Sequence, residues 1–265
     1  MTSLMTSTAL ENGRRQYDYW LTVYRRTWKG SLVTSFLLPL LYLAAMGIGL
    51  GSFVDENGTG ALGGVSYLQF IAPGLLASTA LQIAVGESTY PVLGGIKWHK
   101  TYFSMVATPL RPADVMYGQL AFIAFRILTT CAVFVVVIAA FGGLASPLGL
   151  LGLPVAVLVG MAVAAPVCAI SARLDNDSAF ALIFRFGLIP MFLFSGAFFP
   201  VSQLPDWIEW LAYVSPLWHA VDLSRDLSLG TVELPAALGH LAYLAAWFAV
   251  GTWLAVRGLT RRLIS

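Results

Sequence analysis

The chain has 265 residues, of which 58% are hydrophobic and only 11% are charged, and its mean hydropathy is +0.79. A soluble globular domain has about 25% charged residues, so this composition excludes a disordered chain, a nucleic-acid-binding protein and a typical soluble enzyme. The net charge of +2 is too small to indicate a polyanionic partner. Long apolar runs separate the charged clusters, which indicates that the chain is folded in a lipid bilayer.

The first predicted element, residues 14–30, alternates basic and aromatic side chains. At 3.6 residues per turn this pattern predicts an amphipathic helix that lies along the inner membrane interface. Its candidate interfacial residues are Arg14, Arg15, Trp20, Arg25, Arg26 and Trp28.

Six apolar segments follow, each long enough to cross a bilayer, which needs about 20 residues. They are residues 31–51, 65–86, 115–141, 148–172, 178–199 and 234–256. The sequence therefore predicts an all-α, polytopic fold in which residues 1–265 form a single transmembrane domain. Because six is an even number, both termini are expected on the same side of the membrane.

The distribution of basic residues predicts which side that is. With the N-terminus in the cytoplasm, twelve of the 15 Lys and Arg residues are cytoplasmic, whereas Arg126 and Arg185 fall within spans and only Arg225 is outside. Cytoplasmic loops carry an excess of Lys and Arg, so both termini are expected in the cytoplasm.

The loop at 87–114, between the second and third spans, is long and basic and contains aromatic residues. Residues 97–106 predict a short amphipathic helix with Trp98, Tyr102, Met105 and Val106 on one face. Pro109 and Pro112 are expected to end this helix and to redirect the chain into the third span. A basic loop that only meets anionic lipid is the alternative.

The segment at 200–233, between the fifth and sixth spans, is expected outside. Gly196 and Pro200 break the fifth span before its end, and Pro216 interrupts the chain again. Such breaks predict short re-entrant helices that form a gate, because backbone freed within a membrane must be buried in protein or line a cavity. The alternative is an anchor for the outer leaflet made by the aromatic residues of this segment, Trp207 among them.

Arg126 lies about eleven residues into the third span, where a charge costs about 2.5–3.5 kcal/mol. It is expected to face the bundle, with Glu87 as the nearest counter-ion in the topology. A structural ion pair is favoured over a substrate contact or a gating pair.

The sequence predicts no catalytic or metal-binding residues. The histidines, His99, His219 and His240, fall in separate elements without the spacing of a metal site or a catalytic group, and we interpret them as interfacial residues. Cys131 and Cys168 lie within apolar runs and are interpreted as small core residues.

Two segments carry a family resemblance. The cytoplasmic loop contains Thr108-Pro109-Leu110-Arg111-Pro112, and the outer segment contains Phe194-Ser195-Gly196-Ala197-Phe198-Phe199-Pro200 followed by Ser215-Pro216-Leu217. These motifs, and the order of the elements over essentially the whole chain, resemble the ABC-2 type transporter permeases. Gly47-Ile48-Gly49-Leu50-Gly51 and Gly64-Val65-Ser66-Tyr67 resemble the nodulation or lipo-oligosaccharide exporter (NodJ-type) branch.

The resemblance implies a half-transporter in the bacterial plasma membrane. Two ABC ATPase subunits are the implied partners, together with membrane lipid and a second copy of the chain or a similar permease. ATP and Mg would bind to the ATPase, with no cofactor in this chain, and the sequence contains no Gly-x-x-x-x-Gly-Lys-Ser/Thr phosphate-binding loop.

The resemblance also assigns candidate roles. The residues that would couple the chain to the ATPase are Lys97, Trp98, His99, Lys100, Tyr102, Met105 and Arg111. The residues that would form the substrate pathway and gate are Phe36, Tyr42, Arg126, Phe184, Phe192, Phe194, Gly196, Pro200, Trp207 and Pro216.

The expected function is export of an amphipathic substrate, such as a glycolipid, a lipo-oligosaccharide, a polysaccharide or a drug. One alternative is an ion-coupled secondary transporter, although no acidic residue lies deep within a predicted span. The other is a membrane-embedded transferase that uses the outer polar residues Asp206, Glu209, His219 and Asp222.

Overall fold

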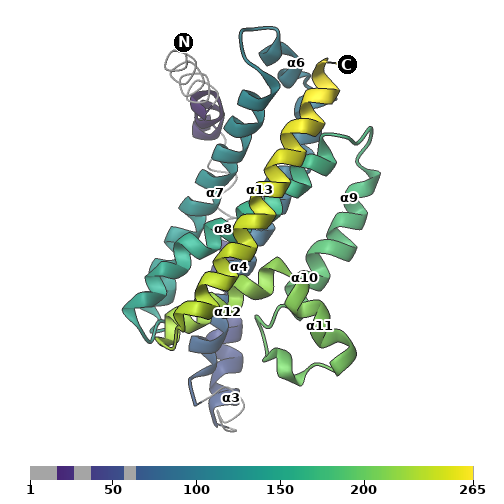
Figure 1. Ribbon diagram of the computed structural model, residues 1–265. Helices are drawn as coiled ribbons and strands as arrows, with labels where there is room; N and C mark the ends of the chain where they lie inside the picture. The colour runs from purple at the N-terminus through teal and green to yellow at the C-terminus, as the bar shows by residue number, and fades with distance from the viewer. Residues whose placement is uncertain (1–16, 27–36, 57–63, 265) are drawn as a thin grey trace.

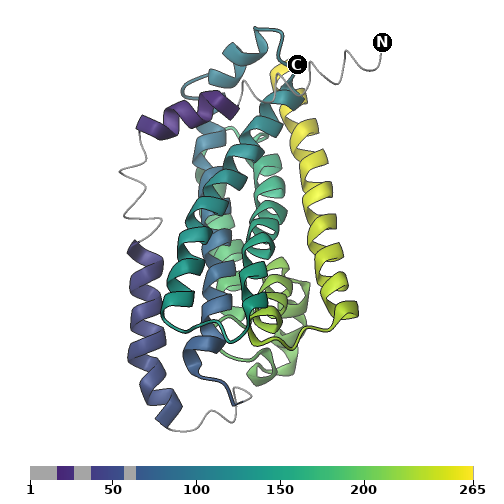
Figure 2. The same ribbon diagram turned by 90° about the vertical axis from the view of Figure 1, so that its left-hand side faces the viewer.

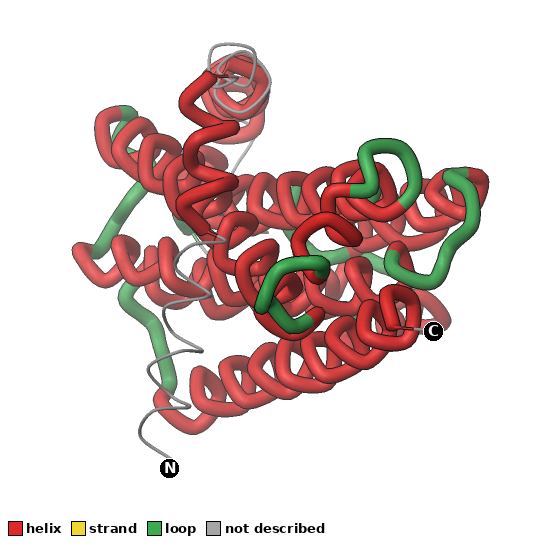
Figure 3. The backbone as a smooth tube through the Cα atoms, turned by 90° about the horizontal axis from the view of Figure 1, so that it is seen from above, coloured by secondary structure: helices red, strands yellow, loops and turns green. Residues whose placement is uncertain are grey.

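The computed structural model describes residues 17–26, 37–56 and 64–264. These residues form helices and loops, with no strand among them (Figure 3). The predictions made for Arg14, Arg15, Trp28 and Phe36 concern residues outside these ranges.

The helices are labelled as in Figure 1. After a helix within residues 17–26, they are α2 (Leu38–Leu43), η2 (Ala44–Leu50), α3 (Gly51–Glu56), α4 (Tyr67–Ser88), α5 (Tyr90–Ile96), α6 (Thr101–Val106), α7 (Pro112–Ala140), η4 (Pro147–Leu151), α8 (Gly152–Ser171), α9 (Ser178–Leu182), η5 (Ile183–Leu188), α10 (Ile189–Phe194), η6 (Val201–Gln203), α11 (Asp206–Val214), α12 (Pro216–Leu229) and α13 (Leu234–Ile264).

Four helical segments of the described chain are long and apolar enough to cross a membrane. They are Tyr67–Ile96, Pro112–Ala140, Pro147–Ser171 and Leu234–Ile264, and Ser178–Phe194 is a shorter apolar helix. Residues 37–56 form a further helical rod through α2, η2 and α3, which runs along the side of the bundle in Figure 2.

Small residues allow the long helices to pack closely. A Cβ atom added at Gly160 of α8 would lie 3.3 Å from the backbone oxygen of Ala80 in α4. A Cβ atom added at Gly251 of α13 would lie 2.7 Å from the backbone nitrogen of Pro166 in α8. Because lipid gives no hydrophobic drive for helices to associate, such close backbone contacts supply much of the packing.

Several helices do not coincide with the predicted spans. α4 continues past residue 86 to Ser88, and α5 extends the helical path to Ile96. The last helix reaches Ile264 rather than 256, whereas the helix within 178–199 ends at Phe194. Hydropathy marks the apolar part of a helix, but its hydrogen-bonded backbone continues into the polar interface.

The two ends of the bundle differ. Residues 17–26, α6 and the C-terminal end of α13 gather at one end, called here the terminal end (Figures 1 and 2). At the opposite end lie α11, α12 and the connection between α7 and η4. The predicted coupling loop and the predicted gate segment therefore lie at opposite ends of the molecule.

Candidate functional site

The loop at 87–114, which is predicted to couple to an ATPase, is called here the coupling loop. The helix within it is shorter than the predicted helix at 97–106. Its helix begins at Thr101 rather than at Lys97, because Lys100 has a left-handed backbone conformation with φ of 52° and separates α6 from α5. Trp98 is 57% exposed whereas Tyr102 is fully buried, so the prediction that they share one face is wrong. Trp98 faces outward and Tyr102 anchors the helix in the bundle.

Tyr102 begins a polar network that runs into the bundle. Its hydroxyl donates a hydrogen bond to Oε1 of Gln119 on α7 (3.2 Å), and Nε2 of Gln119 donates to the backbone oxygen of Glu87 on α4 (3.4 Å). Burial raises the pKa of the Tyr102 phenol well above its usual range. The phenol therefore keeps its proton and remains a donor.

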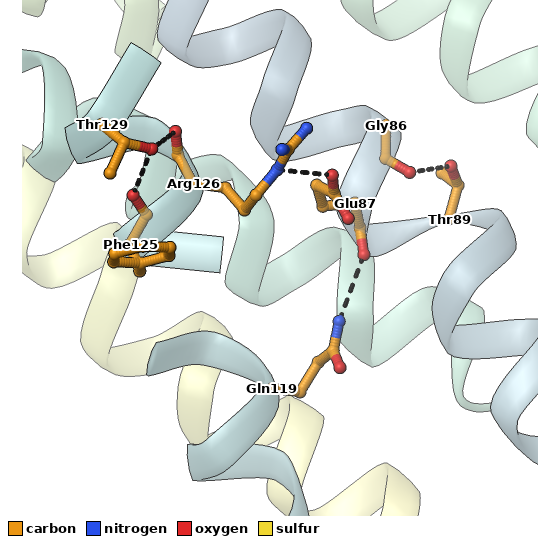
Figure 4. Close-up of polar contacts among 7 residues, drawn as sticks. All are labelled: Gly86, Glu87, Thr89, Gln119, Phe125, Arg126 and Thr129. Atoms are coloured by element: carbon orange, nitrogen blue, oxygen red, sulfur yellow. Dashed lines mark hydrogen bonds and ion pairs between the residues drawn. The ribbon is translucent and has the colours of Figure 1, made fainter. Parts of the chain in front are cut away.

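The predicted ion pair between Arg126 and Glu87 is confirmed. Nε of Arg126 lies 3.1 Å from Oε1 of Glu87, and the two side chains are only 8% and 23% exposed (Figure 4). In the same view Gln119 reaches the Glu87 backbone from the other side. The ion pair and the hydrogen bonds of Tyr102 thus form one network that joins α6, α7 and α4.

The helix within residues 17–26 packs on α7 through aromatic side chains. Trp20 stacks on Phe122 with ring centroids 5.7 Å apart, and Tyr24 contacts Phe122 edge-on. The Arg126 guanidinium lies 4.7 Å from the centre of the Tyr24 ring. The Arg126 side chain therefore links this amphipathic helix to the network, while Arg25 and Arg26 are exposed.

Asp175, in the connection after α8, joins the coupling loop to the last helix. Its Oδ1 lies 3.3 Å from Nζ of Lys97 and 2.5 Å from Nη2 of Arg262. Hydrogen bonds from Arg262, and then from Lys97, lower the pKa of the Asp175 carboxyl. Beside it is a pocket of about 540 Å³, lined by Ile96, Lys97, Lys100, Phe103 and Arg262.

The remaining predicted coupling residues are His99, Lys100, Met105 and Arg111. His99 and Lys100 are exposed, and Met105 is half-buried. Arg111 pairs with Asp114 at the start of α7, where Nε lies 3.4 Å from Oδ2. The backbone N–H of Arg111 also donates to Oδ2 of Asp114 (3.1 Å), which caps the first turn of α7 and so fixes where that helix begins.

At the opposite end, the chain after α10 turns sharply against α4. Gly196 has φ of +77°, which favours glycine, and Ala197 is fully buried against Gly74. Arg225 of α12 donates from Nη2 to the Gly196 carbonyl (2.6 Å) and from Nε to the Phe70 carbonyl (3.3 Å). Sequence reasoning assigned no role to Arg225 beyond predicting it as the one basic residue outside the membrane.

Two of the predicted pathway residues, Tyr42 and Phe192, contact the same side chain, that of Phe198. The Phe198 ring contacts Phe192 (4.9 Å) and Tyr42 (6.0 Å between ring centroids), which brings α10 and α2 together. The others differ in exposure: Phe184, Phe194 and Pro200 are half-buried, Trp207 is 74% exposed and Pro216 is buried in the first turn of α12. Arg126 belongs instead to the Tyr102 network.

Two of the histidines, which lie in separate helices as expected, contact each other. Nδ1 of His219 on α12 lies 2.8 Å from Nδ1 of His240 on α13, although 21 residues separate them. His99 is exposed in the coupling loop. No spacing rule predicts the contact between His219 and His240, because it depends on how α12 folds back against α13.

The sequence is similar to those of known proteins. The family model of the ABC-2 type transporter matches residues 18–229. The chain is an ABC-2 transporter membrane protein. The permease is 33% identical to nodulation protein J of Rhizobium leguminosarum bv. trifolii over 252 residues, which cover 92% of this chain and 94% of the relative.

Two further relatives agree over the same length. The permease is 32% identical to nodulation protein J of Sinorhizobium fredii over 253 residues (93% of this chain, 94% of the relative). It is 30% identical to nodulation protein J of Rhizobium meliloti, again over 253 residues (92% and 94%). The permease thus resembles these proteins along nearly its whole length, and the assignment to the nodulation protein J branch is confirmed.

Proposed function

We propose that this permease is the membrane subunit of an ABC exporter that moves an amphipathic substrate outward across the bacterial plasma membrane. Membership of the ABC-2 family carries this proposal. A separate ATPase supplies the energy, and the working unit contains two permeases and two ATPases. The likeness to nodulation protein J favours a lipo-oligosaccharide or another glycolipid as the substrate.

In this proposal both termini are cytoplasmic and the chain crosses the membrane six times. Residues 31–51 and 178–199 supply the two spans beyond the four long helices. The terminal end then faces the ATPase, and the segment from Gly196 to α12 forms the gate at the outer end. The Tyr102 network supports a route for force, because it joins α6 to α4 and α7 through buried hydrogen bonds.

The intact complex tests the proposal. The permease is extracted from its native membrane in mild detergent and weighed by native mass spectrometry. Two permease chains with two ATP-binding subunits, whose ATP hydrolysis rises when substrate is added, are the expected result. A permease that is recovered without an ATPase after crosslinking in the membrane contradicts the proposal.

The coupling function of α6, and of the exposed turn before it that contains Trp98, is tested with two small changes. Trp98→Ala removes an exposed side chain, and Tyr102→Phe keeps the buried ring but removes the hydrogen bond to Gln119. Each is expected to lower transport per ATP hydrolysed by about tenfold, equivalent to roughly 1.4 kcal/mol of lost coupling. Tyr102→Ala is not used, because removing the buried ring would open a cavity and destabilise the protein, and transport would then fall for a reason other than coupling.

Tyr90→Phe is the matched control, because the Tyr90 ring packs on Phe180 away from the Tyr102 network. It is expected to leave the ratio of transport to ATP hydrolysis unchanged. A normal ratio in both test variants, measured in proteoliposomes, shows that α6 does not couple the two activities.

One observation favours an ion-coupled transporter as the second candidate. Glu87 lies within the helical segment Tyr67–Ile96 rather than at its inner end. Its ion pair with Arg126 argues against a coupling role, since a carboxylate that exchanges ions must be free to change partners. Transport by the permease alone, driven by an ion gradient without ATP, would favour this candidate.

A further inference from the structure

A cluster of polar and aromatic side chains joins three helices at the end opposite the terminal end. This histidine cluster comprises Tyr213 of α11, Trp218, His219 and Asp222 of α12, and His240 and Tyr243 of α13. It lies outside the coupling loop and is not used in the mechanism proposed above.

The cluster connects α11 to the rest of the protein. Nε2 of His219 lies 3.1 Å from the carbonyl oxygen of Tyr213, and the Tyr243 hydroxyl donates to the carbonyl of Val214 (2.6 Å). The His219 ring also stacks on Tyr243 with centroids 4.0 Å apart. Because Trp207 and Trp210 of α11 are 74% and 60% exposed, these contacts near its C-terminal end largely position the helix.

The hydrogen-bond partners determine where the protons lie. The Tyr213 carbonyl can only accept, so Nε2 of His219 carries a proton. If His219 is neutral, its Nδ1 is then an acceptor, and Nδ1 of His240, 2.8 Å away, must donate. Nε2 of His240 lies 3.4 Å from Oδ2 of Asp222, and a carboxylate also accepts only. His240 therefore needs protons on both nitrogens.

The complete network thus holds three ring protons and one positive charge on the pair. With one proton fewer, a lone pair of His240 faces either Asp222 or His219, so either the ion pair with Asp222 or the hydrogen bond with His219 is lost. With one proton more, two N–H groups oppose each other across the 2.8 Å contact and two positive charges adjoin. Only the singly charged pair satisfies every contact.

We infer that His219 and His240 are a positioning pair that binds one shared positive charge, and that this charge docks α11 on α12 and α13. Docking is then strongest at intermediate pH and weakens on both sides. In the exporter proposed above, the gate segment would respond to the pH outside the membrane. The inference concerns the position of α11, so it is tested without measuring transport.

The charges around the pair agree with a cation at His240. From α12, Asp222 faces His240, and Asp226 also lies near enough to interact with it electrostatically. Arg225 of α12 instead donates to carbonyls of α4 and of the turn after α10. From α11, Glu209 is occupied by the Tyr213 hydroxyl, which lies 2.6 Å from its Oε1.

His219 is the member that stays neutral. Burial, and then the positive charge of His240, lower the pKa of His219. The side chain stacks on the Tyr243 ring and meets the Trp218 ring edge-on, and among the described side chains no carboxylate lies within hydrogen-bond distance of it, so a second positive charge there is not compensated. A second positive charge on the pair is therefore opposed by the first.

The test measures the distance between α11 and α13 as the pH changes. Spin labels are attached at Trp210→Cys and Leu238→Cys, both of which are exposed sites, while the native Cys131 and Cys168 are fully buried. Double electron–electron resonance is recorded from below about pH 5 to above about pH 8, a range that includes the pH values at which imidazoles change charge. The distance distribution is expected to be narrowest at an intermediate pH and to broaden or shift at lower and at higher pH.

Three variants separate the pair from other titrating groups. The double variant His219→Gln/His240→Gln is expected to give a distribution that does not change with pH. Asp222→Asn removes the carboxylate that stabilises the charge on His240, so the alkaline change moves to lower pH. His99→Gln is the matched control at the terminal end and keeps the wild-type profile.

Two results overturn the inference. One is a wild-type distance that does not change across this pH range. The other is a double variant that keeps the wild-type pH profile. If the double variant fails to fold, Asp222→Asn decides whether the inference holds. An alkaline change that stays at the same pH, or moves to higher pH, contradicts a positive charge on His240.

Discussion

Arg126 is a charged side chain in the middle of α7, a helix otherwise apolar enough to cross a membrane. A charge at this depth costs about 2.5–3.5 kcal/mol on insertion scales, so it needs compensation. Glu87 supplies the opposite charge and Tyr24 supplies an aromatic face. These contacts argue for a structural role of Arg126, because Glu87 and Tyr24 are residues of the permease and compensate the charge without a substrate.

Removing one member of this pair is expected to destabilise the permease, whereas removing both is not. Arg126→Met leaves the Glu87 carboxylate without its charge partner, which typically costs about 3–5 kcal/mol for a buried pair. The double variant Glu87→Leu/Arg126→Met is expected to regain most of the thermal stability and also transport. Thermal unfolding in detergent and transport in proteoliposomes measure the two effects.

Arg185→Met is the control for losing a positive charge, because Arg185 is exposed. It is expected to change the unfolding temperature little. A double variant that is stable but does not transport would show that the ion pair has a functional role as well.

At the scale of elements, the turn after α10 depends on close contact with α4. A Cβ atom added at Gly74 would lie 2.7 Å from Cα and 2.8 Å from the carbonyl oxygen of Ala197, closer than real contacts allow. Both atoms are backbone, so relief requires the whole turn to move. Arg225 holds the same turn through the Gly196 carbonyl, so movement of the turn also breaks this hydrogen bond.

Gly74→Ala is therefore expected to displace the turn and to destabilise the permease by about 1–3 kcal/mol, the usual cost of overpacking. Gly86→Ala in the same helix is the matched control, since no atom lies within 4 Å of its added Cβ. It is expected to be neutral or stabilising by up to about 1 kcal/mol, because Ala favours helix over Gly. Thermal unfolding of the two variants side by side measures the difference. Equal stability would show that the turn adjusts without cost.

Hydropathy predicted the long helices because about 20 consecutive apolar residues have few alternatives to a membrane helix. It did not predict the contacts that join them. Asp175 reaches Arg262 across 87 residues, and His219 reaches His240 across 21. Such pairs arise from the packing of α8, α12 and α13, and no periodicity within one helix encodes them.

Local signals were also overruled in the coupling loop. Residues 97–106 have a helical pattern, yet Lys100 adopts a left-handed conformation and α6 starts one residue later. Burial of Tyr102 against Gln119 explains this break, because the ring reaches the bundle only after the chain turns. Tertiary packing outweighs helix propensity, which is worth less than about 1 kcal/mol per residue.

At the scale of the whole molecule, residues 37–56 determine the number of spans, because the proposed topology needs the segment at 31–51 to cross the membrane. They form a continuous helical path beside the bundle (Figure 2), but the four long helices do not include them. If the segment at 31–51 crosses the membrane, Arg26 and Glu56 lie on opposite sides. The distribution of Lys and Arg predicts Arg26 inside and Glu56 outside.

Single cysteines decide between these arrangements. Arg26→Cys, Glu56→Cys, Lys100→Cys and Trp207→Cys all place a thiol at an exposed site, and the native cysteines are fully buried. In intact cells a membrane-impermeant maleimide is expected to label positions 56 and 207 and to leave positions 26 and 100 unlabelled until the membrane is opened. Labelling of 26 together with 56 would mean that residues 31–51 do not cross. Labelling of 100 but not 207 would reverse the orientation and place the coupling loop on the side where no ATPase can reach it.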